Sequence, residues 1–112
     1  MKTLFTLFAS LILTSFYFGQ GILNEICYDP SNTDLEGDTN GDGQYAQSED
    51  EFLEFVNTGT DAIDMSGWKV FDTESLEDDM LPPNHVFPDG TILIPGAAIV
   101  VFGGGTPTGD FG

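Results

Sequence analysis

The chain has 112 residues, a length that accommodates one ordinary domain. Its 19 Asp and Glu residues outweigh two basic residues, Lys2 and Lys69, and the formal net charge is -17. This balance excludes the usual binding to nucleic-acid phosphates and to anionic membranes, both of which need clustered Lys and Arg. Apolar residues still occur in patterned runs, so a folded acidic domain is predicted in preference to a disordered chain.

Residues 1–20 differ in composition from the rest of the chain. They carry one charge, Lys2, and are apolar from residue 4 to residue 13 apart from small interruptions. This run is shorter than the ~20 apolar residues of a membrane-spanning helix, and its plan is that of a secretory signal peptide. Cleavage is expected between Phe18 and Gly21. The leader predicts a secreted or cell-surface protein with no transmembrane segment after cleavage.

Residues 21–112 are predicted to form one all-β domain. No window keeps apolar residues at helical spacing over three turns, whereas short β-branched and aromatic runs recur between clusters of Gly, Pro, Asn and Asp. Five or six strands at near-regular spacing fit a β-sandwich. The apolar runs, in chain order, are 22–28, 51–56, 68–71, 85–87, 91–94 and 97–102, with acidic loops at 31–50 and 72–84.

Three local features add expectations about the core and the end of the domain. Trp68 has the largest apolar surface in the chain and follows Gly67, so it is expected to anchor the core. The apolar run 97–102 suits a strand that is buried on both faces. Residues 103–112 are rich in Gly and Thr, which is typical of a loop leaving that strand. Sandwiches of this type have about seven to nine strands, so the sequence is expected to stop before the last ones.

The order of these segments resembles the lamin tail domain. The similarity rests on four stretches, 22–26, 50–57, 66–68 and 87–103, which include Asn24-Glu25, Ser66-Gly67-Trp68 and Pro88-Asp89-Gly90. The resemblance implies an immunoglobulin-like β-sandwich without catalytic activity, which in bacterial members accompanies exported enzymes or belongs to cell-surface proteins. This sequence departs from the family in two respects. The family's later strands are missing, and carboxylates replace the basic surface that links animal members to DNA.

The loop from Asp38 to Glu49 has the spacing of a calcium-binding EF-hand loop. Oxygen-bearing side chains occupy positions 1, 3 and 5, Gly43 occupies position 6, where a sharp turn is needed, and a Glu occupies position 12. The residue at position 7 offers its backbone carbonyl, and the final Glu can close the site with both oxygens. The predicted calcium ligands are Asp38, Asn40, Asp42, Gln44 and Glu49.

Alternatives to this site remain open at the level of sequence. The loop can instead be solvated and mobile, and Asp50 or Glu51 can replace Glu49 as the closing ligand. Helices flank a true EF-hand, whereas a strand is expected from Glu51, so the loop would be EF-hand-like within a β-domain. A second acidic cluster at 72–79 lacks glycine and any ligand register, and it is expected to be a solvated run of charge.

Catalytic constellations are not indicated. His85 is the only histidine and Cys27 the only cysteine, so neither a zinc site nor a nucleophilic triad can be argued. Gly103-Gly104-Gly105 lacks the Lys and the helix of a phosphate-binding loop. An exported chain with one cysteine also has no internal disulfide. The chain is therefore predicted not to be an enzyme.

Two hypotheses about function follow. The first is a calcium-stabilised interaction or anchoring module of an exported bacterial protein, with a protein or a cell-surface component as its partner. The second is an accessory domain at the amino terminus of a secreted hydrolase, a nuclease or phosphoesterase, whose catalytic domain lies beyond Gly112. Both hypotheses leave the oligomeric state undetermined, and neither assigns nucleic-acid binding to this acidic domain.

Overall fold

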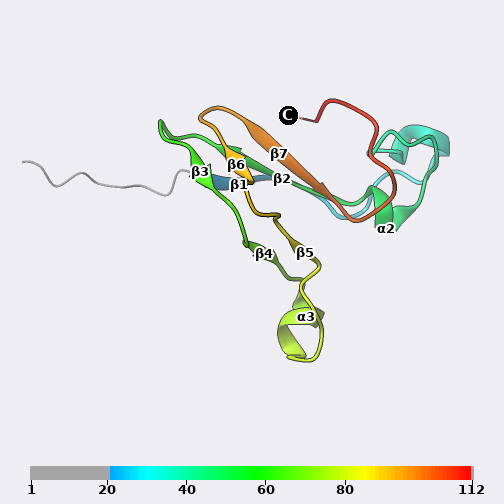
Figure 1. Ribbon diagram of the computed structural model, residues 1–112. Coiled ribbons are helices and arrows are strands. Elements are labelled where there is room, and N and C mark those ends of the chain that lie inside the picture. The colour runs from blue at the N-terminus through cyan, green and yellow to red at the C-terminus, as the bar shows by residue number, and fades with distance from the viewer. Residues whose placement is uncertain (1–20, 112) are drawn as a thin grey trace, which may run out of the picture.

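A computed structural model describes residues 21–111, and the predicted signal peptide lies outside this range. The first layer is a three-stranded antiparallel sheet of β1 (Gly21–Cys27), β2 (Phe52–Asn57) and β7 (Ala98–Phe102), in the order β1-β2-β7. These are the three longest runs with side chains alternating between two faces, so their apolar positions can cover a core. β2 is thus the central strand, and both β1 and β7 lie at edges (Figure 1).

The second layer is built from four strands of two residues each: β3 (Ile63–Asp64), β4 (Lys69–Val70), β5 (His85–Val86) and β6 (Ile92–Leu93). β3 pairs antiparallel with β6, and β4 pairs antiparallel with β5. Two turns separate the pairs. The first contains Gly67, which has φ +74°, and the second contains Gly90, which has φ +84°, conformations that only glycine adopts readily. The β4-β5 arm extends away from the first sheet and ends in a helix (Figure 1).

The core lies where the two layers meet. Met65, Phe87 and Leu93 are buried, and six partly buried side chains pack against them: Phe55, Ile63, Val70, Ala97, Ile99 and Val101. The ring of Phe87 makes an edge-to-face contact with Phe55, with centroids 5.7 Å apart. The core therefore joins the inner face of β2 and β7 to the second layer, and the prediction of an all-β fold is confirmed.

Two expectations about burial are wrong. Trp68 is 46% exposed, and it borders the core instead of anchoring it. The tight turn before it is as predicted, because the Trp68 N–H donates to the carbonyl of Met65 at 3.0 Å. The strand at 97–102 is half-buried at every position of β7, since this strand lies at the edge of the sheet instead of in its centre. Strand length and apolar content do not specify which strand becomes central.

Three short helical segments interrupt the acidic loops. They are η1 (Asp34–Gly37), α2 (Gln47–Asp50) and α3 (Thr73–Glu77). α3 lies where the sequence predicts a loop, and its start is explained by a capping box. The side chain of Asp72 accepts from the Ser75 N–H at 2.7 Å, and the Asp72 N–H donates to Ser75 Oγ at 3.1 Å. No helix within residues 21–111 is long and apolar enough to cross a membrane.

Candidate functional site

The acidic loop that follows η1 lies against the C-terminal segment of the chain. Figure 1 shows both at the same end of the first sheet. Three backbone hydrogen bonds join them: Gly103 N to Glu51 O at 2.8 Å, Gly104 N to Glu49 O at 3.2 Å, and Thr108 N to Asn40 O at 2.9 Å. The loop is therefore hydrogen-bonded to residues more than fifty positions away in the sequence.

Three of the predicted ligands turn their oxygens inward and hold the loop in shape. The carboxylate of Asp38 accepts from the N–H groups of Asp42 and Gly43, at 3.0 and 2.9 Å. Asn40 Oδ1 also accepts from the Asp42 N–H at 3.0 Å, and Asp42 Oδ1 accepts from the Gln44 N–H at 3.0 Å. Gly43 has φ +90°, as the sharp turn at position 6 requires. Side chains at positions 1, 3 and 5 thus share the interior of one turn.

Gly105 is the point at which three residues of the predicted ligand set come together. A Cβ atom at this glycine would lie 2.4 Å from Asn40 Nδ2, 2.9 Å from Asp42 Oδ2 and 3.3 Å from Glu49 Oε2. The next residue, Thr106, donates its N–H to Asp42 Oδ2 at 3.2 Å. The structure therefore brings Asn40, Asp42 and Glu49 together around one glycine. Asp38 lies in the same turn, and Gln44 is exposed beside it.

Asp50 has a structural role that sequence reasoning missed. Its side chain is fully buried, and its two oxygens accept from the N–H groups of Ala46 at 2.7 Å and Asn40 at 3.3 Å. The hydroxyl of Thr39 donates to the Asp50 carbonyl. Both oxygens of this carboxylate therefore bind backbone amides and close the loop. Glu49, in contrast, is exposed, so of these two residues Glu49 is the one whose carboxylate is available to bind a cation.

The donor chemistry of this loop suits a hard divalent cation, since carboxylate, amide and backbone oxygens are the ligands that calcium prefers. The carboxylates do not, however, lie close enough together to form a complete metal-binding site among residues 21–111. No three His, Cys, Asp or Glu side chains within residues 21–111 lie close enough together to form a metal-binding group. What the structure shows is a tight turn in which two carboxylate oxygens, Asp42 Oδ2 and Glu49 Oε2, lie beside Gly105 together with the amide nitrogen of Asn40.

The second acidic cluster, at 72–79, contains the N-cap of helix α3, Asp72, and not a set of metal ligands. The pKa of Asp72 is lowered from its ordinary value of 3.8, first by the Ser75 N–H, then by the Ser75 hydroxyl and by Asn84. The Ser75 hydroxyl lies 2.7 Å from the Asp72 carboxylate, and Asn84 Nδ2 lies 3.1 Å from it. Because these donors favour the ionised form, the cap stabilises the fold above pH 3.8 and is lost as the pH falls through the lowered pKa.

This cap gives a prediction for acid titration. Replacing Ser75 with alanine removes the hydroxyl donor and leaves the backbone N–H, so the pKa of Asp72 is expected to rise toward 3.8. Carbon-detected NMR of the side-chain carboxyl measures this directly. Thr73→Ala, in the same helix, is the matched control and should leave the midpoint in place. An unchanged midpoint in Ser75→Ala would show that the hydroxyl does not bond to the carboxylate.

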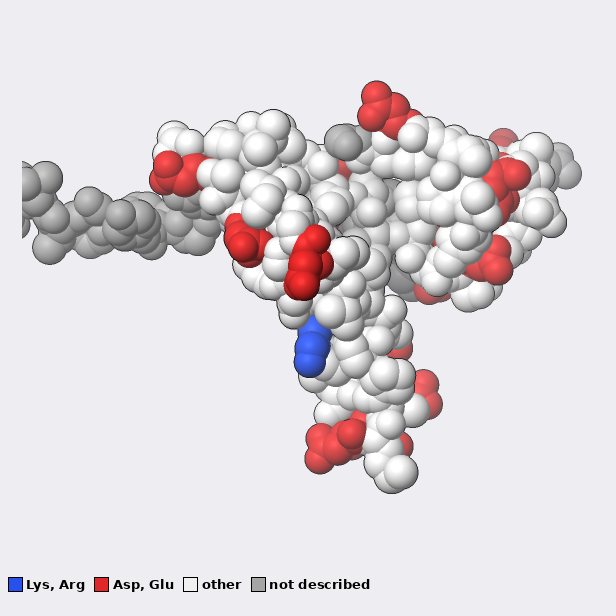
Figure 2. Space-filling model, in the orientation of Figure 1, with Lys and Arg blue, Asp and Glu red and all other residues white. Residues whose placement is uncertain are grey.

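The remaining residues considered for chemistry lie apart from the loop. His85 packs edge-to-face on Phe87, with ring centroids 4.8 Å apart, beside the edge strand β7. Cys27, at the end of β1, is a free thiol and half-buried. Figure 2 shows carboxylates spread over several loops on the visible face and very little Lys or Arg surface. Lys69 is the only basic residue in the described part of the chain.

Comparisons with known proteins identify the family. Searches of curated proteins and of solved structures gave no match. A comparison with protein families matched residues 19–111 to the Lamin Tail Domain, a non-catalytic immunoglobulin-like module, and this span includes the whole described structure. The match confirms the predicted immunoglobulin-like β-sandwich, with its three-stranded sheet against a second, narrower layer. The chain belongs to the lamin tail domain family.

Proposed function

We propose that this chain is a calcium-stabilised interaction or anchoring module without catalytic activity, carried by an exported bacterial protein. The observation that supports the calcium assignment is the approach of two carboxylate oxygens, Asp42 Oδ2 and Glu49 Oε2, to the same point beside Gly105, with Asn40 in the same turn. Asp38 and Gln44 complete the ligand set in the same turn. Calcium bound there would neutralise neighbouring carboxylates and hold the acidic loop against the C-terminal segment.

Export is supported by the composition of the first twenty residues. One basic residue, an apolar run and small residues near Gly19 have the order of a signal peptide. Outside the cell, calcium is present at the millimolar concentrations that weak extracellular sites need. Amino-terminal sequencing of the product from an exporting host tests this part of the proposal, and a retained Met1 would contradict it.

An interaction role is supported by the family and by the surface charge. Lamin tail domains are non-catalytic modules. The acidic surface disfavours nucleic acid and favours a protein or cell-surface component with basic groups (Figure 2). The partner is thus expected to be cationic where it meets the loops.

Calcium is expected to raise the melting temperature of the full chain. For a site with a Kd of about 0.1–1 mM, 10 mM calcium adds roughly 1.4–2.7 kcal/mol, which corresponds to about 5–15 °C in a domain of this size. Thermal melts followed by circular dichroism, with calcium or with a chelator, measure the shift. Magnesium at the same concentration should produce a smaller one, because it demands a tighter octahedral site.

A pair of isosteric variants separates specific binding from charge screening. Asp42→Asn and Asp79→Asn each remove one negative charge, but only Asp42 lies in the turn beside Gly105. Asp42→Asn should lose most of the calcium-dependent rise, and Asp79→Asn should keep it. Equal shifts in both variants, or no shift in the unaltered chain, would remove calcium from the proposed function.

A further inference from the structure

The acidic loop contains the only Asn-Gly pair of the chain, Asn40-Gly41, because each of the other four asparagines precedes a larger residue. Asn-Gly pairs are chemically labile, since glycine has no side chain to keep its backbone nitrogen away from the side-chain carbonyl carbon (Cγ) of the asparagine. Attack at Cγ forms a cyclic imide, which water then opens. Hyperthermophilic proteins contain fewer asparagines, which are thermolabile. The pair is therefore a candidate for spontaneous modification.

The reaction needs water and no cofactor. The backbone nitrogen of Gly41 loses its proton to hydroxide or water and forms a bond to Asn40 Cγ, while the bond from Cγ to Nδ2 breaks and ammonia leaves. Water then adds to either carbonyl of the imide. Opening on one side gives aspartate at position 40. Opening on the other gives isoaspartate, in which the backbone passes through the former side chain and is longer by one carbon atom.

The folded loop holds Asn40 in place. The residue is 1% exposed. Its Oδ1 accepts from the Asp42 N–H at 3.0 Å, and its backbone N–H donates to Asp50 Oδ1 at 3.3 Å. Its Nδ2 donates to the Glu49 carbonyl at 3.5 Å. Ring closure must turn Cγ toward the nitrogen of Gly41 and let ammonia leave, so these bonds have to open and water has to enter first.

The segment that follows β7, residues 103–108, covers this pair, and we call it the strap. Thr108 bonds to both carbonyls of the pair: its N–H donates to Asn40 O at 2.9 Å, and its hydroxyl donates to Gly41 O. A Cβ atom at Gly41 would lie 2.9 Å from Thr108 O. A Cβ atom at Gly105 would lie 2.4 Å from Asn40 Nδ2. The strap therefore lies directly against both residues of the labile pair.

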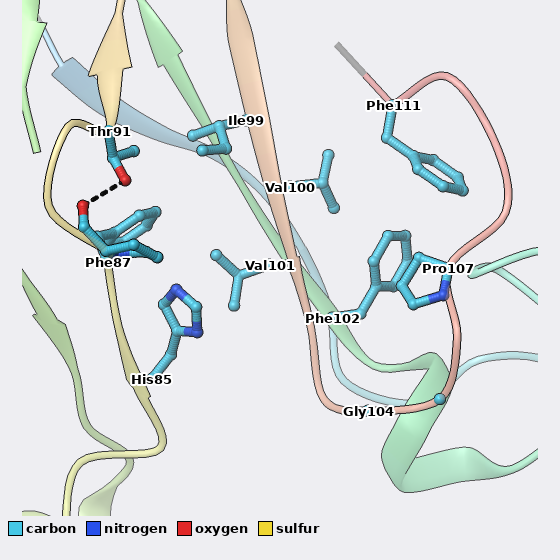
Figure 3. Close-up of a pocket in the computed structure, with 12 residues that line it drawn as sticks. His85, Phe87, Thr91, Ile99, Val100, Val101, Phe102, Gly104, Pro107 and Phe111 are labelled. Carbon is cyan, nitrogen blue, oxygen red and sulfur yellow. Dashed lines mark hydrogen bonds between the residues drawn. The ribbon is translucent and has the colours of Figure 1, made fainter.

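The glycine run at the start of the strap makes this close approach possible. A Cβ atom at Gly103 would lie 2.0 Å from the carbonyl oxygen of Ser48 in α2, so a larger residue would force the strap and the helical turn apart. Figure 3 shows the chain turning at Gly104 and returning to Phe111, whose ring meets that of Phe102 with centroids 4.9 Å apart. The strap is thus fixed to the sheet at both ends and to the loop in between.

The two Asp-Gly pairs of the chain, Asp42-Gly43 and Asp89-Gly90, can form the same imide but are held differently. The glycine N–H in each of them donates to a side-chain oxygen, at 2.9 Å in both cases. The Gly41 N–H donates to no acceptor among residues 21–111. An ionised carboxylate is also a poorer target for attack than an amide. Asn40-Gly41 is therefore the pair that reacts first once the strap opens.

We propose that Asn40-Gly41 is a self-modification site protected by the strap, and that the pair converts to aspartate and isoaspartate only when the strap lifts from the loop. The new carboxylate would lie beside those of Asp42 and Glu49, so repulsion opposes closure of the strap over the product. The isoaspartate form also lengthens the backbone that Thr108 binds. The loop thus changes irreversibly, at a rate set by how often the strap opens. Calcium is not needed for this reaction.

Incubation of the full chain at mildly alkaline pH tests the proposal. Fragment masses locate the conversion, and enzymatic methylation of isoaspartate measures its amount. All samples contain a chelator, so the result does not depend on the calcium assignment. The folded chain should convert at Asn40 at least about tenfold more slowly than the same chain in guanidinium chloride. Equal rates in buffer and in denaturant would show that the fold does not protect the pair. No conversion at Asn40 in denaturant would remove the site itself.

A matched pair of variants tests the role of the strap. Gly105→Ala places a methyl group against Asn40, whereas Gly96→Ala introduces the same backbone strain, at φ +76° instead of +73°, with no atom within 4 Å. Gly105→Ala should speed conversion about tenfold or more, and Gly96→Ala should not. Thr108→Val, which removes one hydroxyl donor, should speed it about two- to tenfold. Equal rates for the two glycine variants would overturn protection by the strap. The comparison of buffer with denaturant uses the unaltered chain, so it still decides the proposal if a variant does not fold.

Discussion

Replacing Met65 with alanine is expected to lower the free energy of unfolding by about 2–5 kcal/mol, the range for truncating a buried methionine. Met65 is 1% exposed and forms the buried centre of the domain with Phe87 and Leu93. Its N–H also donates to the carbonyl of Thr91 at 2.9 Å, beside the β3-β6 pair. Folded domains are stable by only about 5–15 kcal/mol, so the loss is a large fraction of the total.

Chemical denaturation of the unaltered chain and the variant measures this difference. Met80→Ala is the matched control, because Met80 is 91% exposed and the same atoms are removed from water-exposed surface. The control should remain within about 0.5 kcal/mol of the unaltered chain. Similar stabilities for the two variants would show that the two layers do not meet at Met65.

The first sheet could be predicted from the sequence because its strands alternate. β1, β2 and β7 follow the expected ranges to within one residue at either end, since alternating apolar positions act within a single strand. α3 could not be predicted in the same way because it has only five residues, too few for helical periodicity. Its existence depends on the capping exchange between Asp72 and Ser75, which single turns of helix need more than long helices do.

Burial was harder to predict than strand position. Trp68 has the residue type of a core anchor, but its exposure depends on which strands cover the indole, and the two-residue strands of the second layer cover little of it. Met65, three residues earlier, takes the central place. The residue type determines how much free energy the burial of a side chain contributes, whereas the topology determines which apolar side chain is buried.

Only one part of the candidate site, the turn formed by neighbouring residues of the loop, could be predicted from the sequence. Spacing identified Asp38, Asn40 and Asp42, because side chains two residues apart in a tight loop share its interior. It could not show that Gly105 approaches them, since that contact spans more than sixty residues. Spacing favoured Glu49, at position 12, but left Asp50 open as a substitute, and it could not show that Glu49 is exposed and Asp50 fully buried. The difference arises from the helical turn of α2, which directs neighbouring side chains to different sides.

Replacing Asp50 with alanine is expected to cost about 2–4 kcal/mol in calcium-free buffer. The carboxylate is buried and accepts from two backbone N–H groups, and charge-assisted bonds of this kind contribute more than neutral ones. Removing it leaves the amides of Asn40 and Ala46 without their partners inside the folded loop. Chemical denaturation in the presence of a chelator measures the loss.

Glu49→Ala is the control that separates closing the loop from binding a cation. It removes the same charge one residue earlier, from an exposed side chain, so without calcium its stability should stay within about 0.5 kcal/mol of the unaltered chain. In calcium it should lose the rise in melting temperature, because Glu49 is the proposed closing ligand. If Asp50→Ala were as stable as Glu49→Ala without calcium, the buried carboxylate would not close the loop. Comparing the stabilities of the two variants with and without calcium therefore distinguishes the residue that closes the loop from the residue that binds the cation.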